Sequence, residues 1–172
     1  LFRSAIAKLA GEKSVSGLAG ILKQGRSTEV KLAKQALLTL SPQHFLPVVT
    51  EQYEAYPVAS RVVVLELIGE RQADQYNGMV LNEATGIANE KISLSAWRAL
   101  ENIGGPEQLD HMLASFNDVE DKEKLAAIKN AIHSLIDRKN NQKQLISEVQ
   151  KAMQEASPDK QEAYLQLFRT IA

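Results

Sequence analysis

The chain has 172 residues, of which 44% are hydrophobic and 24% are charged, and its formal net charge is −1. This composition is typical of a soluble globular protein, and so balanced a charge gives no overall field that would attract nucleic acid or an anionic membrane. The absence of cysteine excludes disulfides, thiolate catalysis and thiolate metal sites. No run of about 18 apolar residues is present, so no membrane span is predicted.

The first residues, LFRSAIAKLA, already have the apolar spacing of a helix rather than the form of a targeting leader. The chain begins at Leu1 without an initiator methionine. We therefore expect it to be a fragment of a larger protein.

One short apolar pattern, apolar-apolar-x-x-apolar, recurs along the chain and is predicted to end successive helices. The spacing i, i+1, i+4 places three side chains on one face of a helix, whereas a strand would alternate. The triplets are Ala5-Ile6-Leu9, Ala36-Leu37-Leu40, Val64-Leu65-Ile68, Ala99-Leu100-Ile103, Ala131-Ile132-Leu135 and Leu167-Phe168-Ile171. Their closing residues are 28 to 36 residues apart, which is close to the length of a helical hairpin.

A second apolar series with helical spacing lies between consecutive triplets. It comprises Val15, Leu18, Ile21 and Leu22; Leu46, Val48, Val49 and Tyr53; Tyr76, Met79 and Val80; Leu109, Met112, Leu113 and Phe116; and Leu145, Val149 and Met153. Each unit is therefore predicted to contain two amphipathic helices. Stacked hairpins would share one continuous core, and no linker divides the chain, so we predict a single domain over residues 1–172.

Glycine and proline mark the predicted helix ends. The glycines Gly11, Gly25, Gly69 and Gly104 lie just past the ends of apolar stripes, where we expect a left-handed residue to close each helix. Ser41-Pro42 and Ser157-Pro158 are typical of a hydroxyl cap followed by proline in the first turn. Pro47 is predicted to start its helix late or to bend it.

The stretch ALENIGGPEQLDHML, residues 99–113, resembles a HEAT repeat, in which an Ala-Leu-x-x-Ile-Gly helix end is followed by a proline turn and a helix with paired leucines. The other units carry this pattern in part. Pro47, Gly78 and Gly86 depart from it, and irregular hairpins are expected there. The resemblance implies an all-α, right-handed α-solenoid of about five antiparallel helix pairs, whose second helices form a concave surface that binds another macromolecule. A tetratricopeptide array has a similar period, but its Trp, Gly-Tyr and Ala-Phe spacing is missing.

No residue pattern predicts catalysis. His44, His111 and His133 fall in different units without an HExxH pair, and neither a nucleophile motif nor a phosphate loop is present. We predict no metal, no cofactor and no enzymatic activity. One enzyme class stays open, a HEAT-like DNA glycosylase or other nucleic-acid-binding solenoid, which would need a basic concave face that the balanced charge disfavours.

Projecting the repeat onto each second helix selects candidate partner-binding residues. Positions two and five before a closing residue face away from the core, and they are Gln35, Leu38, Val63, Glu66, Arg98, Glu101, Asn130, His133, Gln166 and Arg169. From this strip and the only tryptophan we take as candidates Leu38, Val63, Glu66, Trp97, Arg98 and Glu101. The charged members would fix a partner's orientation, and the apolar ones would supply desolvation. Trp97 has two interpretations, because it lies on the flank of its helix: packing against the neighbouring unit, or anchoring a partner.

We therefore predict a non-catalytic protein-binding or scaffold module, with another protein or another domain of the parent chain as its partner and no nucleic acid or membrane. The alternative is a structural spacer, which predicts an apolar end face at Phe2, Tyr164 and Phe168. The sequence does not indicate a compartment or an oligomeric state.

Overall fold

The computed structural model describes residues 12–138 and 142–171, and within these ranges the chain forms ten α-helices and no strand. Short 3₁₀ helices at Tyr53–Ala55, Asp74–Tyr76 and Pro106–Gln108 lead into α5, α6 and α8. The α-helices are α2 (Glu12–Gln24), α3 (Ser27–Leu37), α4 (Pro42–Glu51), α5 (Val58–Glu70), α6 (Asn77–Thr85), α7 (Glu90–Ile103), α8 (Leu109–Asp118), α9 (Lys122–Arg138), α10 (Gln142–Glu155) and α11 (Pro158–Ile171).

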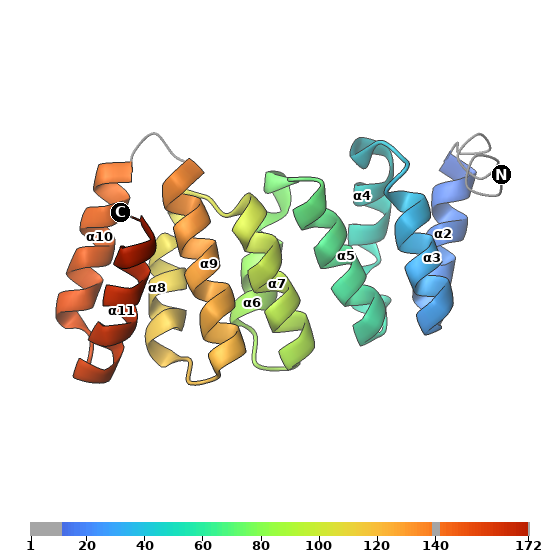
Figure 1. The fold of residues 1–172 in the computed structure, drawn as a ribbon. Coiled ribbons are helices and arrows are strands. Elements are labelled where there is room, and N and C mark those ends of the chain that lie inside the picture. The colour runs from blue at the N-terminus through green and yellow to red at the C-terminus, as the bar shows by residue number, and fades with distance from the viewer. Residues whose placement is uncertain (1–11, 139–141, 172) are drawn as a thin grey trace.

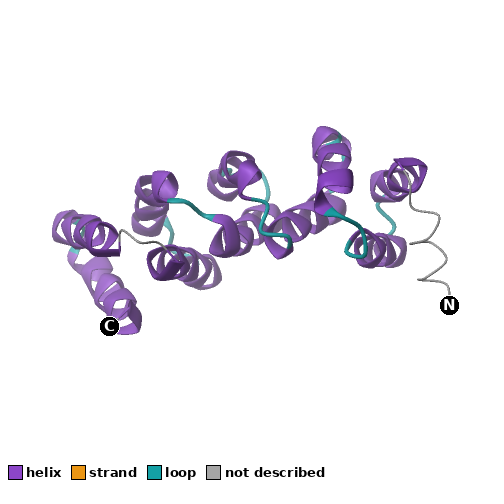
Figure 2. Ribbon diagram, turned by 90° about the horizontal axis from the view of Figure 1, so that it is seen from above, coloured by secondary structure: helices purple, strands orange, loops and turns teal. Residues whose placement is uncertain are grey.

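Pairs of helices follow one another in chain order, from α2 and α3 at one end of the molecule to α10 and α11 at the other (Figure 1). Consecutive helices pack in pairs, α2 with α3, α6 with α7, and α8 with α9, and the second helices α3, α5, α7, α9 and α11 each contact the next in that series. Viewed from above, the molecule is an elongated double row of helices (Figure 2). The described part of the chain is thus all-helical, and helices that are neighbours in sequence are neighbours in space.

The predicted apolar triplets line the core at the ends of the second helices. Val64, Leu65, Ile68, Leu100, Ala131, Ile132 and Leu135 are all fully buried, and Ala99 and Ile103 nearly so. Leu40 is half-buried and lies beyond the last residue of α3. All these residues belong to, or pack against, one continuous apolar cluster. The triplet at residues 5–9 lies outside the described residues.

The predicted left-handed helix ends are confirmed at Gly25 only, whose φ is 70°. Gly104 has a φ of −55°, and Gly69 lies inside α5, so the prediction is wrong at both. The left-handed residue after α5 is Gln72, with φ 51°. Gly11 is not among the described residues.

Gly69 is needed for a close approach of two helices rather than for a turn. A Cβ atom at this position would lie 3.0 Å from the Cα and 3.2 Å from the Cβ of Ala99 on α7. Only a residue without a side chain allows α5 and α7 to pack so closely.

The proline predictions were partly right. Pro42 opens α4 after Ser41, but the Ser41 hydroxyl donates to Gln43 Oε1 and accepts no hydrogen bond from the first N–H groups of the helix. Pro47 lies in the interior of α4, so a late helix start is wrong. The burial of Phe45, Leu46 and Val49, each 0% exposed, offsets the backbone hydrogen bond that proline cannot make.

Two arginines join the ends of neighbouring second helices. Arg71, just after α5, donates to the carbonyls of Leu38 and Leu40 after α3. Arg138, at the end of α9, donates to the carbonyls of Asn102 and Gly104 at the end of α7. Both place a positive charge at the negative end of a helix dipole and satisfy carbonyls that lack helical partners.

Among the described helices, none is long and apolar enough to cross a membrane.

Candidate binding cleft

A cleft of about 870 Å³ lies along the second helices α3, α5 and α7. This recess is the candidate binding site, and it is called the cleft below. Its lining residues are Ser27, Val30, Lys31 and Lys34 of α3; Val58, Ala59, Val62, Val63, Glu66, Gly69 and Glu70 of α5; and Lys91, Leu94, Ser95, Arg98, Ala99 and Asn102 of α7.

The amino-terminal half of the cleft is apolar with a lysine on each side. Its floor on α5 and α7 is formed by Val58, Val62 and Leu94. Val58 is 37% exposed. Lys31 of α3 and Lys91 of α7 are both exposed at its margins. Within residues 12–138 and 142–171, neither ammonium group forms an ion pair.

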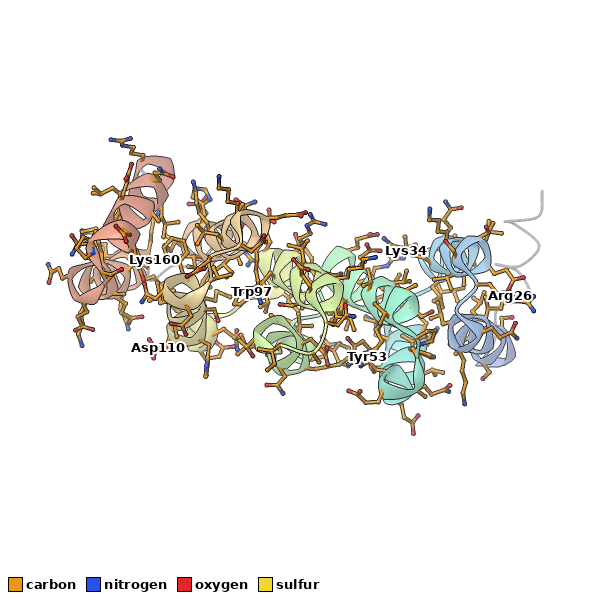
Figure 3. The ribbon with its side chains drawn as sticks, turned by 90° about the horizontal axis from the view of Figure 1, so that it is seen from below. Arg26, Lys34, Tyr53, Trp97, Asp110 and Lys160 are labelled. Atoms are coloured by element: carbon orange, nitrogen blue, oxygen red, sulfur yellow. The ribbon has the colours of Figure 1, made fainter. Side chains whose placement is uncertain are left out.

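The carboxyl-terminal half is occupied by ion pairs. Lys34, labelled in Figure 3, extends from α3. Its Nζ lies 2.9 Å from Glu66 Oε2 and 2.5 Å from Glu70 Oε1, which joins α3 to α5 across the cleft. Burial lowers the pKa of Lys34, but the hydrogen bonds that its ammonium group donates to Glu70 and Glu66, together with their negative charges, outweigh burial, and the pKa is raised overall. Arg98 reaches away from the cleft to Glu123 of α9, at 2.8 Å, with both side chains largely exposed.

The floor between α5 and α7 is held by close packing. Ser95 Oγ donates to the Val62 carbonyl at 3.3 Å, and Gly69 lies against Ala99 one to two turns further along. These small residues keep the two helices together without large side chains between them. The relative positions of Val62 and Leu94 are therefore fixed before any partner arrives.

Three of the six predicted binding residues line the cleft: Val63, Glu66 and Arg98. Val63 contributes little surface, because it is only 7% exposed. Leu38 and Glu101 are half-buried and lie outside the lining.

The prediction that Trp97 belongs to the partner-binding surface is wrong. Its side chain is 0% exposed and belongs to the apolar core, so it offers no surface to a partner. The packing interpretation is the one that agrees with its position. The flank of a helix in a stacked row faces the neighbouring helices, and a large aromatic ring there is buried by them.

The sequence projection missed most of the amino-terminal half of the cleft. It stopped at position five before each closing residue, although position nine has the same helical phase, about one turn earlier. Position nine gives Lys31, Ala59 and Leu94, all of which line the cleft. Lys91 lies one further turn back. The pattern that could have found these residues was thus present in the sequence.

The three histidines lie on three different helices and form no cluster. His44 and His111 are exposed, and His133 Nδ1 lies 3.2 Å from Asp137 on the same helix. The described part of the chain contains no group of three His, Cys, Asp or Glu side chains that could hold a metal ion.

The end face predicted for a spacer is only partly apolar. Tyr164 is buried and packs on Phe116, with ring centroids 4.8 Å apart. Phe168 is half-buried, and Leu165 beside it on α11 is 51% exposed. Phe2 lies outside the described residues.

Comparisons of the chain with known protein families, with curated proteins and with solved structures found no match in any of the three.

Proposed function

We propose that this chain is a non-catalytic protein-binding module, a right-handed α-solenoid of about five HEAT-like helix pairs, whose second helices bind a segment of another protein or of another domain of the parent chain. The observation that carries the proposal is the cleft along α3, α5 and α7. A recess that crosses three consecutive second helices is what a row of hairpins offers to an extended or helical partner segment.

The physical properties of the cleft favour a protein segment. Its floor is apolar at Val58, Val62 and Leu94, and its margins carry charges of both signs. An apolar centre with a polar rim is the usual composition of a protein interface. The close packing of α5 on α7 means that little binding energy would be lost to ordering the receptor.

Peptide selection on the purified chain tests this proposal. Random displayed peptides are selected on the wild-type chain, and each selected peptide is then measured by fluorescence anisotropy. Ala59→Trp places a large ring in the cleft from an exposed position on α5. The matched control, Ala114→Trp, makes the same change at an exposed position on α8, outside the cleft lining.

We expect Ala59→Trp to weaken the selected peptides at least about tenfold, since it removes the recess they occupy, and Ala114→Trp to leave affinity unchanged. Peptides that bind both variants as tightly as the wild-type chain would show that the cleft is not the binding surface.

A second candidate, the structural spacer, is favoured by Leu165, an exposed leucine on the last described helix. In that role α11 packs against another domain of the parent protein. In the full-length parent, Leu165→Asp would then lower the melting temperature of the adjoining domain, whereas Glu162→Asp on the same helix would not. An unchanged melting temperature with Leu165→Asp would remove this candidate.

A further inference from the structure

We infer that the partner of the cleft is an acidic amphipathic protein segment, which places an apolar side chain on Val58, Val62 and Leu94 and carboxylates at Lys31 and Lys91. This inference rests on the proposed function and adds the chemistry of the partner. It locates binding in the amino-terminal half of the cleft.

The two lysines set the sign of the charge. Lys31 projects from α3 and Lys91 from α7, so the α5 floor at Val58 and Val62 lies between them. Both are exposed and without an ion pair to any described residue. No acidic residue lines this half of the cleft. A carboxylate arriving at either margin therefore meets an ammonium group that has no competing partner in the described chain.

The carboxyl-terminal half offers no cation without an ion pair. Glu66 and Glu70 share the single ammonium group of Lys34. Lys34 is therefore already paired, and Arg98, the other cation that lines this half, is paired with Glu123 of α9. An acidic segment is consequently directed toward Lys31 and Lys91, and a basic segment is disfavoured there by both lysines.

The apolar floor separates a protein segment from a nucleic acid. A phosphate backbone could approach the lysines, but it would leave Val58, Val62 and Leu94 without an apolar contact. An amphipathic segment satisfies both features at once, since apolar and acidic side chains alternate along one helical face or strand. The partner we infer is therefore a protein segment that combines leucine-like side chains with flanking Asp or Glu.

The test uses peptides selected from a random displayed library on the wild-type chain. The expected consensus has Asp or Glu on both sides of an apolar residue. The best selected peptide is synthesised in two forms with identical apolar residues, one as selected and one with every acidic residue replaced by lysine. Binding of both forms is measured to the wild-type chain and to two double variants with the same change in net charge.

The first variant, Lys31→Glu/Lys91→Glu, reverses the charges of the cleft. The matched control, Lys23→Glu/Lys151→Glu, reverses two exposed lysines on α2 and α10, away from the cleft. We expect the wild-type chain and the control to prefer the acidic peptide, and the cleft variant to lose it by about tenfold or more, because two attractions become two repulsions. The cleft variant should instead prefer the lysine form.

Failure of this inference can be distinguished from failure of the proposed function. If selected peptides are neutral or basic, or if both double variants bind the acidic peptide equally, the inferred partner chemistry is overturned. Sensitivity to Ala59→Trp would in that case still support the cleft as the binding surface. If single-stranded DNA binds the wild-type chain as tightly as the acidic peptide and depends on the same two lysines, a nucleic acid is the occupant and the inference is also overturned.

Discussion

Gly69→Ala tests whether the close approach of α5 to α7 is a required feature of the fold. Replacing a glycine inside a helix by alanine stabilises the helix by up to about 1 kcal/mol through backbone propensity. At Gly69 the added Cβ would lie 3.0 Å from Ala99 Cα and 3.2 Å from Ala99 Cβ. Two non-bonded carbon atoms in ordinary van der Waals contact are at least about 3.5 Å apart, so α5 and α7 would have to separate by roughly half an ångström.

The cost of such overpacking is about 1–3 kcal/mol. Set against the propensity gain of up to about 1 kcal/mol, the expected net effect of Gly69→Ala is a loss of about 0–2 kcal/mol. Both atoms of Ala99 that the new methyl group meets belong to, or adjoin, the backbone of α7, so no flexible side chain can rotate away.

Gly78→Ala is the matched control, because Gly78 is in α6, is exposed, and has no atom within 4 Å of an added Cβ. It should raise the free energy of unfolding by up to about 1 kcal/mol. Urea denaturation followed by circular dichroism gives both values. The two variants should differ by about 1–3 kcal/mol; an equal stabilisation of the chain by both would refute the argument that Gly69 is required by helix packing.

Three further predictions follow from buried or helix-end groups. Trp97→Ala should lower the free energy of unfolding by about 3–5 kcal/mol in urea denaturation, since it empties a fully buried site, and a loss below about 1 kcal/mol would mean that the ring is not in the core. Arg138→Gln should cost about 0.5–1 kcal/mol by removing the cation from the end of α7, whereas Lys151→Gln on α10 should cost nothing measurable; equal effects would contradict the capping role. Burial raises the pKa of Tyr53 from 10.0 to about 12, so the neutral phenol stabilises the fold below the unfolded pKa and this contribution is lost as the pH rises through about 12. Between pH about 10 and 12 the wild-type chain should therefore lose more stability than Tyr53→Phe, and parallel losses would show that Tyr53 titrates alike in both states.

The sequence predicted the helices and the faces they bury, because both depend on local spacing. The recurrence of Val64-Leu65-Ile68 and Ala99-Leu100-Ile103 at helical intervals was enough to place these residues in the core. It also predicted Glu66 and Arg98 on a common side, and both line the cleft, whereas Val63, which was predicted to be exposed, is only 7% exposed.

The contacts between helices depend on the distances between the helices, and the apolar periodicity of the sequence carries no information about those distances. From the sequence, Gly69 was predicted to end a helix. In the structure it lies inside α5 against the backbone of Ala99, where it allows two helices to pack closely. Trp97 had two possible environments in the sequence, and the neighbouring helices decided for the core. Lys34 meets Glu66 and Glu70 only because α3 and α5 lie side by side. A helical pattern fixes which way a side chain faces along its own axis, whereas the partner across the gap depends on how closely and at what register the next helix packs.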